Sequence, residues 1–163
     1  MESFGWDIFE IVATLCEQLI LFYFICSFMK YDLKTRRKKA VYIFGSILGT
    51  ALVTALNSVT LYDWWLSVIY ITFWFVFSLI FINGRVLSKL LASILSDVVS
   101  ISASNIVTGI LSVTLKSTPT QLYTTQGWYR VLGVLMCQIL DLFLYSLILK
   151  FVSRTILKMK KKE

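Results

Sequence analysis

Charged residues divide this sequence into five long apolar runs, and these runs constrain the fold more than any other feature. A helix of about 20 apolar residues, rising about 1.5 Å per residue, is long enough to cross the hydrocarbon core of a bilayer. Buried helices of a soluble protein would need polar faces, which these runs lack. We therefore expect an all-α polytopic membrane protein that forms a single transmembrane domain over residues 1–163. The predicted spans are residues 11–29, 40–62, 64–84, 90–115 and 131–149, and a basic tail follows at 150–163.

Basic residues are concentrated on one side of the predicted membrane. All but two of the 16 lysines and arginines fall in the first loop, in the turn between the third and fourth spans, or in the tail. Cytoplasmic loops collect such residues. Four tryptophans mark the opposite side, where an amphipathic indole is favoured: Trp6, Trp64, Trp65 and Trp128. We therefore predict an outside N-terminus and an inside C-terminus, in a plasma membrane or a bacterial inner membrane.

Several classes of function are excluded by the composition. The chain has no histidine, so it cannot form a Ser–His or Cys–His nucleophile pair or a histidine-ligated metal site. It lacks a phosphate-binding glycine loop, and its three cysteines lie inside predicted spans. Basic loops beside anionic lipid explain the net charge of +7. We therefore expect no enzymatic activity, no cofactor, no metal and no nucleic-acid partner.

Three carboxylic acids lie within the predicted spans: Glu17, Asp97 and Asp141. A charge at the centre of a bilayer costs on the order of 3 kcal/mol on insertion scales, so such side chains usually face protein or water. No span offers a basic partner at matching depth, so we expect some of these acids to be protonated or hydrogen-bonded across helices. Because protein must cover them, we predict a homodimer or a complex with another membrane protein.

A polar stripe runs along the fourth span. It repeats at intervals of four, three, four and four residues, which place its members on one helix face: Ser93, Asp97, Ser100, Ser104 and Thr108. The stripe is either a groove for a ligand, ion or proton, or a packing seam, because small and hydroxyl residues let membrane helices approach closely. We expect Asp97 to face the third or fifth span, in a pocket with Ser100, Ser104 and, if it lies near, Asp141. The candidate ligand-binding residues are Glu17, Asp97, Ser100, Ser104, Thr108, Gln138 and Asp141.

Glycines predict one close contact and one turn. Gly45 and Gly49 form a small-xxx-small pair on the second span, a pattern typical of tight helix packing in membranes. Asn83-Gly84-Arg85 predicts a tight turn, so the third and fourth spans should form an antiparallel hairpin.

The order of these features resembles that of a known family. The first span carries Glu17 and the aromatic-rich stretch Gln18 to Phe24, and a basic loop follows at Lys34–Lys39. The basic turn from Asn83 to Lys89, the mid-span pair Ser96-Asp97 and the start of the last span at Arg130 to Gly133 come next. Over most of its length the chain thus resembles the membrane sensor region of GHKL-type sensor histidine kinases related to the staphylococcal accessory-gene-regulator receptor.

This resemblance implies a receptor-like sensor domain that detects an extracellular ligand, a peptide in that family, and signals to the cytoplasmic side. It also implies a homodimer and a role in a two-component, quorum-sensing system. The family continues with a phospho-accepting histidine and an ATP-binding domain, which this sequence lacks, so we expect a sensor region without its kinase. Two other classes stay open. The intramembrane acids favour a small transporter or a substrate-binding membrane subunit of an uptake system, and five spans with short loops suffice for a non-catalytic scaffold or assembly protein.

Overall fold

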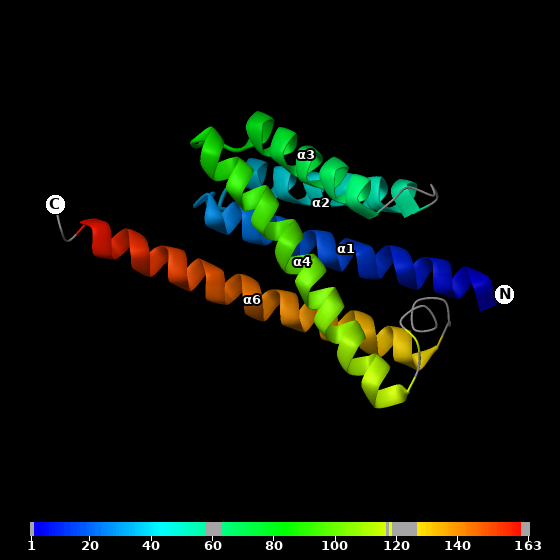
Figure 1. Cartoon of the computed structure of the whole chain (residues 1–163). Coiled ribbons are helices and arrows are strands. Elements are labelled where there is room, and N and C mark those ends of the chain that lie inside the picture. Colours follow the sequence, from blue (N-terminus) through cyan, green and yellow to red (C-terminus); the bar gives the residue numbers. More distant parts are fainter. Residues whose placement is uncertain (1, 58–62, 117, 119–126, 161–163) are drawn as a thin grey trace.

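Each predicted apolar run contains one helix in the computed structural model, which describes residues 2–57, 63–116, 118 and 127–160. The helices in order are α1 (Glu2–Phe28), α2 (Arg36–Asn57), α3 (Asp63–Phe81), α4 (Val86–Leu115) and α6 (Trp128–Lys160). No strand occurs in these ranges. Successive helices alternate in direction, so the two termini lie at opposite ends of the bundle (Figure 1).

The helices have the length and surface that a bilayer requires. α1, α2, α4 and α6 are long and apolar enough to cross a membrane, and α3 contributes a shorter apolar stretch, Trp65–Phe81. Large apolar side chains are exposed on the outside of the bundle, among them Ile80, Leu87 and Ile139, each about two-thirds exposed. Lipid can cover such side chains, whereas water cannot do so without cost. The predicted all-α class is confirmed, and the apolar helices support a multi-pass membrane protein.

Three of the helices, α1, α4 and α6, are longer than the predicted spans, whereas α3 ends at Phe81, three residues before the predicted end of its span. α1 begins at Glu2, α2 begins inside the basic loop at Arg36, and α6 continues through much of the predicted tail to Lys160. A helix satisfies its own backbone hydrogen bonds, so nothing requires it to stop where charged residues meet the membrane surface. Three parts of the predictions lie outside the described residues: the end of the second span (58–62), most of the connection before the last span (117 and 119–126) and the end of the tail (161–163).

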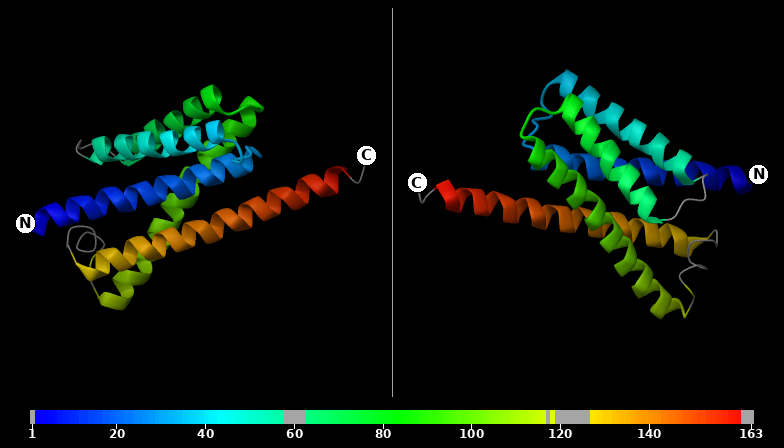
Figure 2. Two further views of the ribbon diagram at one scale, coloured as in Figure 1. Left: turned by 180° about the vertical axis from the view of Figure 1, so that it is seen from behind. Right: turned by 45° about the horizontal axis from the view of Figure 1, so that its top comes forward.

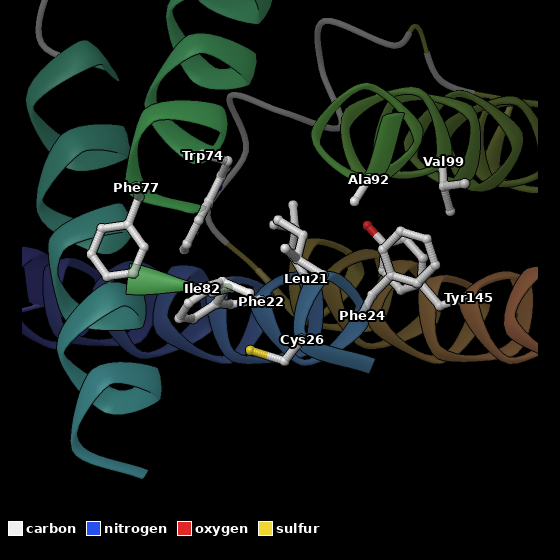
Figure 3. Packing of buried hydrophobic residues seen from close by; sticks show 11 residues of the cluster. Leu21, Phe22, Phe24, Cys26, Trp74, Phe77, Ile82, Ala92, Val99 and Tyr145 are labelled. Atoms are coloured by element: carbon white, nitrogen blue, oxygen red, sulfur yellow. The ribbon is translucent and has the colours of Figure 1, made fainter. Parts of the chain in front are cut away.

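α1 lies at the centre of the bundle and contacts α2, α4 and α6. Phe22 and Phe24 of α1 point to different sides, because two residues turn a helix by about 200°. Phe22 packs against Trp74 of α3, with 4.7 Å between ring centroids, and Phe24 stacks on Tyr145 of α6 at 4.4 Å. All four side chains are buried, and Figure 3 shows Phe22 beside Trp74 in one group and Phe24 beside Tyr145 in another. α1 therefore lies between α2 and α6, as the two views of Figure 2 show, whereas α3 and α6 are also connected through direct contacts with α4.

α2 approaches its neighbours through the predicted glycine pair, which is buried. A Cβ atom at Gly45 would lie 2.6 Å from the ring of Phe22. One at Gly49 would lie 2.8 Å both from Gln18 Oε1 and from the ring of Trp74. Real Cβ atoms do not approach other atoms this closely, so only glycine permits the observed spacing. The predicted packing role of the pair is confirmed.

The predicted hairpin of the third and fourth spans is also present. α3 ends at Phe81 and α4 begins at Val86, and the two helices run antiparallel and in contact. Gly84 lies in the turn with φ of 146°, a backbone conformation that residues with a Cβ atom rarely adopt. The turn therefore requires glycine at position 84.

The glycine contact predicts a specific loss of stability. Gly49→Ala should lower the free energy of unfolding by about 1–3 kcal/mol, because overpacking forces buried side chains to shift. Gly109→Ala is the matched control, since a Cβ atom there would meet nothing within 4 Å. Unfolding of the two detergent-solubilised variants can be compared by thermal or denaturant titration. Equal stability would show that α2 does not pack on α1 through Gly49.

Candidate functional site

A cavity of about 220 Å³ lies in the middle of the bundle, between side chains of all five described helices. We call it the central cavity. Glu17 of α1, Asp97 of α4 and Asp141 of α6 line it together. These are the three acids that the sequence places inside spans, and each comes from the middle part of its helix. The structure therefore brings all three intramembrane carboxyl groups to one space.

The carboxyl groups differ in how they are satisfied. Asp97 is buried and hydrogen-bonded to the Ser67 side chain of α3, so it faces the third span as expected. Asp141 is only 6% exposed, and its Oδ1 has no hydrogen-bond partner among the described residues. Glu17 is half-buried. A buried oxygen without a partner is costly, so the Oδ1 atom of Asp141 is the least satisfied polar atom in the cavity wall.

The two tyrosine hydroxyls in the cavity wall donate to acceptors within the protein. Tyr70 of α3 donates its hydroxyl to Gln18 Oε1 of α1 over 2.6 Å. Tyr145 of α6 donates to the backbone carbonyl of Ser96 on α4 over 2.9 Å. These bonds connect α1 to α3 and α4 to α6 around the cavity.

A second space, which we call the end cavity, adjoins the first. It measures about 320 Å³ and is lined mainly by α1, α4 and α6. Glu17, Val53 and Asn57 line both cavities, so the two meet at Glu17. Arg130 lines the end cavity close to the start of α6, where its Nε donates to the carboxylate of Glu10. Together the cavities form a path, lined by both polar and apolar side chains, from the end of the bundle that carries the N-terminus to Asp141.

One part of the polar stripe of α4 is a packing seam, and the other part lines the cavities. Ser93 and Ser96 are fully buried and donate their hydroxyls to backbone carbonyls of their own helix, so this part is a packing seam. Ser100 lines the central cavity beside Asp97, and Ser104 and Thr108 line the end cavity. The expected pocket of Asp97 therefore contains Ser100 and Asp141, whereas Ser104 lies in the neighbouring space.

Gln138 lies outside both cavities. Its Nε2 donates to the backbone carbonyl of Ala13 over 3.2 Å, so it connects α6 to α1. Gln138 lies three residues before Asp141, so the two side chains are close to the same face of α6. The Gln138 side chain nevertheless bonds to the backbone of α1 and not to the cavity. Gln138 is therefore a packing contact, and its predicted place in the ligand-binding site is corrected.

The sequence analysis missed several residues of the site. Ser67, Tyr70 and Tyr145 sit in strongly apolar runs, where hydroxyl and aromatic residues usually fill space. Gln18 follows Glu17 directly, yet a neighbouring residue points about 100° away on a helix. The spacing of Ser67 and Tyr70, three residues apart, is the one signal that would have placed two polar groups on the same face of α3.

Self-association is predicted because acids at depth need protein to cover them. Asp97 and Asp141 are both buried within this one chain. Covering these groups therefore requires no second subunit. The homodimer stays a prediction that rests on the family resemblance.

Comparison with protein-family models, with curated proteins and with solved structures finds no match for this chain. The resemblance to sensor kinases therefore stays a prediction, and the function must be argued from the cavities.

Substitutions at Asp97 separate a charge requirement from a packing requirement. Asp97→Asn retains an acceptor for Ser67 and should leave the free energy of unfolding within about 0.5 kcal/mol of the parent. Asp97→Leu leaves the Ser67 hydroxyl without its partner and should cost about 1 kcal/mol or more. Thermal unfolding in detergent measures both. A Leu variant as stable as the parent would show that the Ser67 contact contributes nothing.

Proposed function

We propose that this chain is a receptor-like domain with five transmembrane helices, an outside N-terminus and an inside C-terminus. It binds an extracellular ligand in the central cavity and signals to the cytoplasmic side. The observation that supports this most is the path through the two adjoining cavities, which leads from the N-terminal end of the bundle to three carboxyl groups at its middle. Binding sites in helical bundles are concave and carry a few convergent polar groups, and the central cavity has this character.

The proposed orientation rests on the distribution of charge over the folded chain. The α1–α2 connection, the α3–α4 turn and the far end of α6 lie at one end of the bundle (Figure 1). These segments contain almost all of the basic residues. Trp6, Trp65 and Trp128 lie near the starts of α1, α3 and α6, at the opposite end. By the positive-inside rule the basic end faces the cytoplasm.

A small transporter is the second candidate, because transporters bind substrates near the middle of the membrane. Its supporting observation is the unpartnered Oδ1 of Asp141. The inner half of the bundle favours the receptor instead. Between the central cavity and the basic end the space is filled by buried aromatic side chains, including Phe24, Phe77 and Tyr145. A transporter would have to separate this cluster in every cycle, whereas a receptor would not.

The orientation predicts the result of reporter fusions. Fusions at Lys39 and Lys162 should report a cytoplasmic location, and a fusion at Thr120 an external one. A paired reporter, active on only one side of the membrane, gives a positive signal in each case. A cytoplasmic signal at Thr120 would contradict the five-span arrangement.

Access to the cavity tests the receptor against the transporter. In a chain whose three cysteines are replaced by alanine, Ser104→Cys should react with a small membrane-impermeant thiosulfonate added from outside. It should stay unmodified in inside-out vesicles. Ser93→Cys is the matched control on the same helix face, since Ser93 is fully buried in the packing seam and should not react. Equal reaction from both sides would favour the transporter, and no reaction from either side would exclude an open path.

The family resemblance extends this proposal to its partners. It suggests that the ligand is a peptide, that the receptor is a homodimer and that its output belongs to a two-component, quorum-sensing pathway. Crosslinking of the chain in native membranes tests the dimer, with a known membrane dimer as the positive control.

A further inference from the structure

We propose that the central cavity binds a cationic nitrogen group, an alkylammonium or guanidinium group of the ligand. This inference deepens the proposed function and rests on it, because it names the chemistry of the group that enters the cavity. The hydrogen-bonding groups that line the central cavity support it.

Among the described residues, the charged groups of this wall are all of one kind. Glu17, Asp97 and Asp141 contribute three carboxyl groups, and the hydroxyls of Tyr70 and Tyr145 already donate to protein acceptors. Lysine and arginine are absent from the lining residues that the structure describes. A ligand with charged N–H donors would therefore meet three carboxyl groups and no competing cation among the described lining residues. An ammonium group brings three N–H donors and a guanidinium group up to five.

Asp141 supplies the second, independent observation. Its side chain is more than nine-tenths buried, lines the cavity and carries an Oδ1 atom without a partner among the described residues. Buried polar atoms are nearly always paired, so an exception in a cavity wall points to a partner that arrives from outside the chain. A charged donor would form the strongest hydrogen bond with it.

A bare metal ion fits the cavity less well than an organic cation. The described residues contain no group of three His, Cys, Asp or Glu side chains close enough to hold a metal ion. The carboxyl groups are therefore too far apart for one metal ion, but a cavity of about 220 Å³ has room for a larger group between them. The rings of Tyr70 and Tyr145 line the same space, and aromatic rings attract organic cations.

The charges along the path to the central cavity also favour a cation. A ligand entering from the N-terminal end passes Glu17, which lines both cavities. Arg130, the cation of the end cavity, is bonded to Glu10 and is thus partly neutralised. The electrostatic potential along the path therefore becomes more favourable to a cation with depth.

The test uses the purified full chain and n-butylammonium as the probe, with butyramide and butyrate as neutral and anionic controls at equal ionic strength. Butylammonium should raise the unfolding temperature in a saturable manner, and the two controls should not. Asp141→Asn should weaken the effect about tenfold or more, as expected when a charged hydrogen bond is lost. Asp7→Asn removes the same charge from an exposed position on α1 and should leave the effect unchanged.

Glu17→Gln keeps the test decisive if Asp141→Asn does not fold, since Glu17 is less buried and lines the same cavity. An equal effect of butyramide, or undiminished butylammonium stabilisation in both variants, would overturn the proposal. The cysteine-access experiment is independent of this outcome. An externally open cavity without cation preference would refute this inference alone, whereas cation binding in a cavity open from both sides would refute the receptor.

Discussion

The packing of Phe22 and Phe24 on opposite sides of α1 is the interaction on which the rest of this bundle depends. In a bilayer, helices gain nothing by hiding apolar surface from lipid, so close packing must hold them together. Phe22 binds α1 to α3, and Phe24 binds it to α6. Gly45 and Gly49 then allow α2 to come close enough to cover the same rings. One short stretch of α1 thus fixes the positions of three other helices.

The cavity exists because this dense packing stops one turn earlier along α1. At Glu17 and Gln18 the side chains become polar, and the facing positions on α3, α4 and α6 are Tyr70, Asp97 and Asp141. Polar groups of this kind cannot interdigitate as the rings do, and each must find a hydrogen-bond partner. Most find one across the helices. The aromatic cluster around Phe22 and Phe24 lies between the cavity and the basic end of the bundle. It therefore keeps the helices around the cavity in place.

The sequence predicts the helices of this fold well, because a bilayer leaves an apolar run few alternatives to a spanning helix. It also identifies Asp97 and Asp141 as special, since an acid at such depth is costly wherever the helix points. Local spacing could not decide which residues face one another across helices. Gln138 is predicted for the site from its spacing to Asp141, yet it bonds to the backbone at Ala13. Tyr70 and Tyr145 are missed because their roles depend on Gln18 and Ser96, which belong to other helices.

α6 carries Asp141 at the cavity and then continues without a break to Lys160, beyond the ends of the other helices (Figure 1). At about 1.5 Å per residue, the distance along the helix between these residues is roughly 28 Å. In a helix of this length, a small change of tilt at one residue gives a larger displacement at the far end. A tilt of about 10° around Asp141 would displace the far end by roughly 5 Å. A small change of tilt at the cavity would thereby be amplified at the far end of α6.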